Sequence, residues 1–440
     1  MTSKSAANSL PQLIKSAMQR HPALGQLWVG FSGGLDSTVL LHLLNQNGIP
    51  VKAVHVHHGL SSNAERWLDH CEAVARELQV PFVAVRVQVD RSGGGIEQGA
   101  RKARYKAFDS VMSSGDQILL GHHGDDQAET FLYRLMRGAG VLGLSGMAES
   151  RPLGEGKSLL RPLLSVGRRE LEAWALEQGL SWIEDESNAD EAFERNYLRR
   201  QVMPVLSTRW SARQSIQRAA DNLRESALLL EELALADLQI CDIRRERLGE
   251  SLFLATFTNL SIARRKNLLR GWVLLQGGMA PESVVLQEAL AQIEKASADA
   301  QVEVRLGGCV VRRFQRRLYL TPVMEPFSTT EESLQWDGVS ALLLPRGGVL
   351  ESVQGWPQGV YEVKYRRGGE RVQPLDRLRS QTLKKVLQER ALEPWLRDRI
   401  PLVYLDGELV AVADLFCCKA GCSTLSVTPS VKPPSWRFFD

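Results

Sequence analysis

Phe31-Ser32-Gly33-Gly34-Leu35-Asp36-Ser37-Thr38 joins an apolar run at 27–29 to a helical pattern that begins at Val39. Its two adjacent glycines lack the Cβ atoms that would hold a polyanion away from the backbone. The amide N–H groups of the turn and of the new helix N-terminus therefore converge, as they do where phosphate binds. The hydroxyls of Ser32, Ser37 and Thr38 add further donors. The segment predicts a phosphate-binding turn between a strand and a helix.

This turn differs from a Walker A loop, because no lysine follows the glycines to reach the β- and γ-phosphates. Its order, Ser-Gly-Gly-x-Asp-Ser, resembles the pyrophosphate loop of enzymes that split ATP into AMP and pyrophosphate. A plain strand-to-helix connection capped by Asp36 or Ser37 is the alternative. The flanking strand and helix favour ATP binding. The residues expected to bind it are Ser32, Gly33, Gly34, Leu35, Asp36 and Ser37.

The composition limits the class of protein. The chain has 440 residues, 44% of them hydrophobic, which is enough for two or three domains with real cores. Its 54 basic and 51 acidic residues nearly balance, so a nucleic-acid partner must be inferred from local patches. The polar N-terminus, the absence of a run of 18 apolar residues and the scattered cysteines predict a cytoplasmic protein without a membrane span.

The first part of the chain alternates between two patterns. Apolar runs at 27–31, 51–57, 81–89 and 117–121 are separated by amphipathic stretches at 38–46, 64–79, 97–112 and 126–137. This alternation predicts an α/β fold with a doubly wound, Rossmann-like parallel sheet. After Pro204 helical periodicity dominates, and beyond 361 short strands and one helix indicate an α+β fold. We expect three domains, at 1–215 (ATP-binding), 216–320 (helical) and 321–440 (small α+β).

Several polar motifs follow predicted strands and so meet at one edge of the sheet, where ligands bind in such folds. One of them, 121–130, contains His122, His123, Asp125, Asp126 and Glu129. Acidic residues in a first helical turn also stabilise the helix dipole, which accounts for one or two of these carboxylates. It does not account for two histidines beside three acids. We expect a site for Mg²⁺-ATP and proton transfer, and regard zinc binding by the adjacent histidines as the weaker alternative.

Basic residues gather in three places. Arg101 and Arg104 share one face of a predicted helix, where a solvated salt-bridge ladder is the alternative. Six arginines and no acid occupy 195–218, and 361–400 holds eleven basic residues against six acidic ones. Such runs are often only solvated faces, but after an ATP-binding sheet they favour contacts with RNA phosphates.

Six segments in this order resemble one family, the bacterial tRNA(Ile)-lysidine synthases. They are SGGLDS (32–37), HVHHGL (55–60), GIEQGARKARY (95–105), GHHGDDQAETFLYRLMRGAG (121–140), LLRPLL (159–164) and EDESN with RNYLRR (184–200). A weaker likeness extends through RRGGERV (366–372) and LEPWLRDRIPLVY (392–404). One departure is Gly124, where a small residue such as Ala is expected.

The resemblance implies an enzyme that uses ATP and L-lysine to convert the wobble cytidine of a CAU-anticodon tRNA(Ile) to lysidine, so that the tRNA reads AUA instead of AUG. The base would be adenylated first, and the lysine amine would then displace AMP. Asp36 is expected to hold Mg²⁺, and Asp126 or Glu129 to act as the base. The residues expected to contact the tRNA or the reacting groups are Arg101, Arg104, His123, Arg195, Asn196, Arg199, Arg366 and Arg367. The sequence leaves open whether the chain forms a homodimer.

Three other functions share parts of this pattern. A tRNA sulfur transferase also adenylates its base, but it needs accessible cysteines near the ATP loop, and only Cys71 lies in the first domain. An amide synthetase needs an ammonia source, and no glutaminase segment is visible. A non-catalytic tRNA-binding protein would carry a degenerate ATP site, whereas Asp36 and the acids of 125–129 are intact.

Reversing the charge of both Arg366 and Arg367 is expected to weaken tRNA binding and to leave ATP binding intact, because contacts with RNA phosphates depend on positive charge. Filter binding of tRNA and a titration with ATP measure the two effects. An equal loss of both would contradict the assignment, since it would indicate a folding defect.

Overall fold

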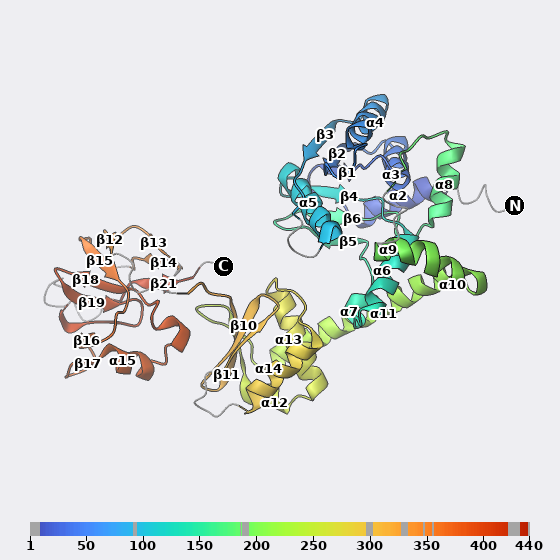
Figure 1. Ribbon diagram of the computed structural model, residues 1–440. Coiled ribbons are helices and arrows are strands. Elements are labelled where there is room, and N and C mark those ends of the chain that lie inside the picture. The colour runs from blue at the N-terminus through green and yellow to red at the C-terminus, as the bar shows by residue number, and fades with distance from the viewer. Residues whose placement is uncertain are drawn as a thin grey trace. The chain divides into compact units, whose positions relative to one another are not determined.

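The computed structural model describes residues 9–90, 95–184, 186, 193–295, 302–326, 333–345, 348–353, 356–420 and 432–438. The chain divides into two compact units, 1–228 and 229–440 (Figure 1). The division falls inside one long helix, α11 (Ala212–Ile240). Within the described ranges, no helix is both long enough and apolar enough to cross a membrane.

The first unit is built on a six-stranded sheet in the order β3-β2-β1-β4-β6-β5. The strands are β1 (Leu27–Gly30), β2 (Lys52–His57), β3 (Phe82–Arg86), β4 (Gln117–Leu119), β5 (Ser150–Pro152) and β6 (Ser158–Leu160). All pair in parallel except β5, which forms an antiparallel edge. The connecting helices are α3 (Leu35–Gln46), α4 (Ala64–Glu77) and α5 (Gly95–Val111). The predicted doubly wound parallel sheet is confirmed.

Helices cover both faces of this sheet, because successive strand residues point to opposite sides. Val29 and Leu119 pack into a core with α2 (Ser9–Arg20), α3, α4 and α8 (Arg168–Glu177). Their neighbours Trp28 and Ile118 face the other side, where Phe108 of α5 covers them. The helices cover the two faces, and the carboxyl ends of the strands lie at the edge between them.

The remaining helices of the first unit follow the sheet's carboxyl edge. They are α6 (Gly124–Met136), α7 (Val141–Leu144), α9 (Glu194–Tyr197), the π-helical turn η2 (Leu198–Val202) and α10 (Met203–Arg209). The first half of α11 also belongs to this unit. Its Arg224 donates hydrogen bonds to the carbonyls of Ser145 and Met147, which fix the loop after α7.

The second unit begins with the expected helices and adds a sheet. The helices are the end of α11, α12 (Leu254–Asn259), α13 (Ile262–Leu275) and α14 (Ser283–Lys295). They pack on an antiparallel sheet of β7 (Arg244–Arg245), β8 (Glu250–Phe253), β9 (Glu303–Leu306), β10 (Cys309–Phe314) and β11 (Arg317–Pro322). β7 and β8 depart from the helical character expected of 216–320, because strands of two and four residues are too short to show an alternating pattern.

The end of the chain has the predicted α+β character. One sheet contains β12 (Leu334–Trp336), β15 (Tyr361–Lys364), β18 (Leu402–Leu405), β19 (Glu408–Val412) and β20 (Phe416–Cys417). Smaller ones contain β13 (Leu342–Leu344), β14 (Gly348–Glu351) and β21 (Ser435–Arg437), and β16 (Arg371–Val372) with β17 (Gln381–Thr382). The helical elements are α15 (Leu383–Glu389) and the 3₁₀ turn η3 (Pro394–Leu396). The division into three domains at 215 and 320 stays a prediction.

Replacing Leu119 by alanine should destabilise the first unit by about 2–5 kcal/mol, because the side chain is fully buried between the sheet and its helices. Leu24→Ala is the matched control, since Leu24 is 96% exposed and should change stability by no more than about 0.5 kcal/mol. Hydrogen exchange of β1 and β4 amides in a urea series reports the free energy of unfolding of this unit. Equal effects of the two variants would contradict the packing described.

Candidate active site

The turn after β1 is shaped by Gly33, whose φ is +80°. A Cβ there would lie 2.8 Å from both Cys71 Sγ and Ile183 Cδ1. The Gly33 carbonyl accepts a hydrogen bond from the Ile183 amide at 2.8 Å, which ties the turn to the segment after α8. Only glycine tolerates both this backbone angle and this contact.

The helix that follows the turn begins without a side-chain cap. Gly34 is the N-cap residue of α3 and offers no side chain to the amides of the first turn. Ser32 and Ser37 hydrogen bond to each other, with their Oγ atoms 3.1 Å apart, and so hold the turn closed. Because uncapped amides at a helix N-terminus attract an anion, 32–37 have the geometry of a phosphate site.

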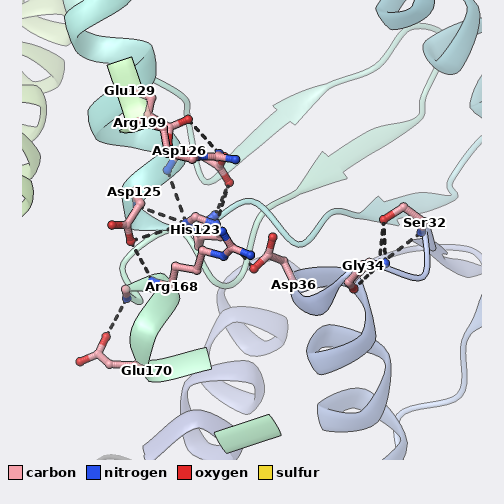
Figure 2. A network of polar contacts seen from close by, with 12 residues as sticks. Ser32, Gly34, Asp36, His123, Asp125, Asp126, Glu129, Arg168, Glu170 and Arg199 are labelled. Atoms are coloured by element: carbon pink, nitrogen blue, oxygen red, sulfur yellow. Dashed lines mark hydrogen bonds and ion pairs between the residues drawn. The ribbon is translucent and has the colours of Figure 1, made fainter. Parts of the chain in front are cut away.

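Asp36 lies in the first turn of α3 and points toward His123 (Figure 2). Its Oδ1 is buried without a hydrogen bond, and His123 Nε2, 3.5 Å away, lies at ion-pair distance only. A Cβ at Gly121 would lie 2.7 Å from the Asp36 carbonyl oxygen, so the end of β4 packs directly on this turn. A buried carboxylate oxygen without a partner, beside a phosphate turn, fits a Mg²⁺ ion that phosphates also coordinate.

Metal binding by side chains alone has no support among the residues that the structure describes. They contain no group of three His, Cys, Asp or Glu side chains that could hold an ion. Magnesium commonly takes only one or two carboxylates and completes its shell with water and nucleotide phosphates. Asp36 therefore suits a metal that arrives with a nucleotide.

His123 is the N-cap residue of α6 and is 1% exposed. Its Nδ1 accepts from the amides of Asp125 (3.2 Å) and Asp126 (3.4 Å), and Asp126 Oδ2 accepts from the His123 amide (3.0 Å). This reciprocal cap places the imidazole proton on Nε2, which faces Asp36 and Asp126. Burial lowers the pKa of His123, but Asp36, Asp126 and Asp125 outweigh it and raise the pKa above its ordinary value. The residue thus fixes the start of α6 and orients two carboxylates.

Asp125 turns away from the other acids. Its Oδ2 accepts a hydrogen bond from the amide of Arg168, the first residue of α8, at 2.8 Å (Figure 2). The carboxylate stabilises the positive end of that helix. Asp125 and Glu129 therefore have different partners, since Asp125 accepts from the start of α8 and Glu129 accepts from Arg199.

Asp126 and Glu129 form a buried acidic pair that arginines close. Arg199 donates to Glu129 through Nε (2.6 Å to Oε1) and Nη2 (3.0 Å to Oε2), and Nη2 also reaches Asp126 Oδ1 at 3.3 Å. Arg195 Nη2 lies 3.7 Å from Asp126 Oδ1 and 3.8 Å from Glu129 Oε2. Arg199 belongs to the π-helical turn η2, a form that often marks functional sites.

The environment separates the two acids. Burial raises the pKa of Glu129, with Arg199 offsetting only part of the effect. Burial also acts on Asp126, but His123, His122 and Arg195 outweigh it and lower its pKa. Two neighbouring carboxylates with pKa values pushed apart are suited to different roles.

Two further histidines lie among cations at the same edge. Burial, with Arg104 as the next cause, lowers the pKa of His58 to about 4. Burial lowers the pKa of His122 to about 3, where Arg161, Arg104 and Arg195 oppose its protonation and Asp126 favours it. The His122 and His58 Nδ1 atoms are buried without hydrogen bonds. Arg104 is thus near the predicted site, and Arg101, one turn earlier on α5, is exposed.

The remaining candidates fall into two groups. Asn196 is half-buried in α9, between the two arginines that close the acidic pair. Arg366 and Arg367 belong to the second unit. Arg366 is half-buried and pairs with Asp398 at 2.9 Å, whereas Arg367 is exposed. Their expected contact with tRNA stays a prediction.

Sequence reasoning gave no role to Ile183 or Arg161. Ile183 contributes through its backbone amide, which leaves no trace in side-chain chemistry. Arg161 follows β6 and is 2% exposed, at the edge where the other motifs meet. Its only signal was its place in the LLRPLL segment at 159–164.

Gly124, the one departure from the family pattern, packs closely. A Cβ there would lie 3.0 Å from both Arg213 Nη1 and the Val166 carbonyl oxygen. An alanine would require these neighbours to shift by a few tenths of an ångström.

Comparison with known families covers most of the chain. A PP-loop domain matches residues 3–206, a TilS substrate binding domain matches 252–319, and a TilS substrate C-terminal domain matches 361–429. Among solved structures, a U34-tRNA thiolase, NcsA from Methanococcus maripaludis, aligns with 51% of this chain and 80% of its own, at 17% identity and a TM-score of 0.41.

Curated relatives are similar over nearly their whole length. A tRNA(Ile)-lysidine synthase from Serratia proteamaculans is 42% identical over 97% of this chain and 98% of its own. One from Pseudomonas fluorescens is 45% identical over 88% of each. With this identity and coverage, the chain belongs to the tRNA(Ile)-lysidine synthase family.

Proposed function

We propose that this protein joins L-lysine to C2 of the wobble cytidine in a CAU-anticodon tRNA(Ile), at the expense of ATP, which leaves as AMP and pyrophosphate. The names of its curated relatives support the reaction. The observation that carries it is geometric: an uncapped phosphate turn and Asp36 lie beside His123, which in turn orients the buried pair Asp126 and Glu129. Nucleotide activation and amine attack would thus share one edge of the sheet.

The first step activates a poor electrophile. The cytosine O2 attacks the α-phosphorus of ATP, the bond to the β-phosphate oxygen breaks, and pyrophosphate leaves. The first amides of α3, which no side chain caps, would stabilise the charge that gathers on the phosphates, because the helix fixes them before the reaction. Asp36 would hold Mg²⁺, which supplies further neutralisation of that charge.

The second step needs a neutral amine. The lysine ε-amine is normally protonated, so a carboxylate must first bind it as a cation and then accept its proton. Asp126, with its lowered pKa, is suited to hold the ammonium, and Glu129, with its raised pKa, to accept the proton. The amine nitrogen then bonds to C2, the C2–O2 bond breaks, and O2 departs with AMP.

Arg199 forms a two-pronged contact with Glu129 of the acidic pair. An incoming ammonium would compete with this guanidinium for Glu129 and Asp126. A guanidinium cannot itself be deprotonated near neutral pH, so it neutralises the buried acids without reacting.

Transfer of sulfur in place of lysine is disfavoured by the position of Cys71. This thiol packs behind Gly33 and is fully buried. Burial raises its pKa to about 12, which leaves almost no thiolate. The other free cysteines of the described residues, Cys241, Cys309, Cys417 and Cys418, belong to the second unit.

Purified protein incubated with Mg²⁺-ATP, labelled lysine and unmodified CAU-anticodon tRNA(Ile) should release AMP and place stable label in the RNA. Methionine tRNA, which has the same anticodon, should remain unlabelled. Asp36→Asn should lower both AMP release and labelling by at least about 100-fold, if the loss of a group that stabilises the transition state costs about 3 kcal/mol. AMP release without lysine incorporation would refute lysine as the nucleophile.

Glu129→Gln should separate the two steps. Pyrophosphate release with tRNA should continue, while transfer of lysine should fall by about 100-fold or more, because the proton acceptor is lost. In the unaltered protein, lysine transfer should decline as pH falls through the raised pKa of Glu129, since the protonated carboxyl cannot accept a proton. The exposed Glu177→Gln variant is the control. Equal loss of both steps in Glu129→Gln would contradict this division of roles.

A further inference from the structure

A column of stacked side chains stands beside the candidate active site, on α5 and β5. Arg101 and Arg151 each place their guanidinium carbon 5.1 Å from the centre of the Tyr105 ring. Arg101 Nη2 also donates to the Tyr105 hydroxyl at 3.3 Å, and the charges of Arg151 and Arg161 act on the pKa of the same hydroxyl. One phenol thus gathers three guanidinium groups.

Arg161 joins this column to the active-site edge. It follows β6 directly, and the Leu120 amide donates to the Leu160 carbonyl at 2.9 Å, so Arg161 lies next to the chain that leads to His122. Arg161 is only 2% exposed, and its Nη1 donates to the Ala148 carbonyl at 2.7 Å. Its Nε is buried without a hydrogen bond.

The positive charge of this column is not balanced locally. In the part of the chain that the structure describes, Arg101, Arg151 and Arg161 form no salt bridge with a carboxylate. Burial lowers the pKa of Arg161, and the charges of Arg151 and Arg101 lower it further, although Tyr105 opposes them. Burial raises the pKa of Tyr105, but the three arginines outweigh it and leave the pKa below its ordinary value. A buried charge such as that of Arg161, with like charges nearby, is costly unless an anion joins it.

The position of the column favours RNA over ATP as the source of that anion. The turn at 32–37 follows β1, whereas Arg161 follows β6, two strands further in the order β1-β4-β6. Neighbouring strands lie about 4.8 Å apart, so the two sites are separated by roughly 10 Å along the sheet edge. Guanidinium forks bind phosphate through paired hydrogen bonds, and their planes stack on nucleobases. An arginine–tyrosine–arginine column with an exposed outer arginine offers both contacts.

We propose that Tyr105, Arg151 and Arg161, with Arg101, form a binding site for a phosphodiester group of the RNA strand next to the nucleotide that reacts. The proposal rests on the proposed function, because it takes the bound RNA to be the substrate. Tyr105 positions the guanidiniums, and Arg151 and Arg161 contact the phosphate. The group bound is one that every RNA sequence carries, so the site would hold the strand in place without reading its bases.

Arg151→Gln tests the contact, and Arg137→Gln is the matched control. The guanidinium carbon of Arg137 lies 5.3 Å from the centre of the Tyr133 ring, and its Nη1 donates to the Tyr133 hydroxyl at 2.9 Å. Arg137 therefore forms an arginine–tyrosine pair like that of Arg101 and Tyr105, but outside the column. Affinity for unmodified tRNA is measured by filter binding over a series of salt concentrations, and affinity for ATP by titration calorimetry. Arg151→Gln should weaken tRNA binding about tenfold, as loss of a hydrogen bond to a charged group does. It should reduce the salt slope by about 0.7, the value for one contact with a single strand. ATP affinity should stay unchanged.

Two further variants distinguish the loss of a phosphate contact from a folding defect. Arg151→Lys keeps the charge but not the fork, so it should restore the salt slope while affinity recovers only in part. Tyr105→Phe keeps the stack but removes the shared hydroxyl, and it should weaken tRNA binding less than Arg151→Gln. If both bind tRNA as weakly as Arg151→Gln and lose ATP binding too, the column is structural and the proposal is wrong.

Two other outcomes of the Arg151→Gln experiment would overturn the proposal. Loss of ATP affinity in Arg151→Gln with unchanged tRNA affinity would assign the anion to the nucleotide, and equal losses in Arg151→Gln and Arg137→Gln would reduce the effect to net charge. Binding is measured without lysine transfer, so the two proposals fail separately. A protein that binds tRNA through Arg151 but transfers no lysine refutes only the proposed function.

Discussion

Gly33 has no room for a side chain, and the geometry of the first unit's site follows from that fact. The turn lies between Cys71 on one side and Ile183 on the other, with a positive φ that glycine alone accepts readily. Because the turn is this tight, α3 begins at Leu35 with its first amides uncapped. Asp36 then falls in the first helical turn, against the end of β4. A bulkier turn would move the amides and the carboxylate together.

His123 links the turn that carries Asp36 to the start of α6. Both nitrogens of its imidazole have polar neighbours: Nδ1 accepts from two backbone amides, and Nε2 faces Asp36 and Asp126. The acids around it are balanced by Arg199 and Arg195, which come from the short segments after α8. Charge is thus compensated within a small buried volume, and the compensation differs for each acid. That difference separates a carboxylate that stays ionised from one whose pKa is raised.

Local patterns predicted the parts of this arrangement that short segments specify. The alternation of apolar runs and amphipathic stretches sets the strand and helix order of the first unit, and the glycine turn sets its ligand edge. The sequence did not predict β7 and β8, because they are too short for a periodic signal. They are stabilised by pairing with each other, and β8 also pairs with the distant β11. The same limit applies to the site. Asp126 and Glu129 are neighbours on one helix, whereas the pairing of Glu129 with Arg199 depends on a contact seventy positions away.

The contact between Ile183 and Gly33 also has a consequence for the order in which the chain is made. The glycine turn emerges early in synthesis, yet the Ile183 amide that secures it emerges about 150 residues later. Arg199 then closes the acidic pair, and Arg224 secures the loop after α7. The nascent sheet can pair its first strands long before this. A nucleotide site of final geometry therefore exists only after the ribosome has passed Ile183, and a fragment that ends before Arg224 lacks part of its frame.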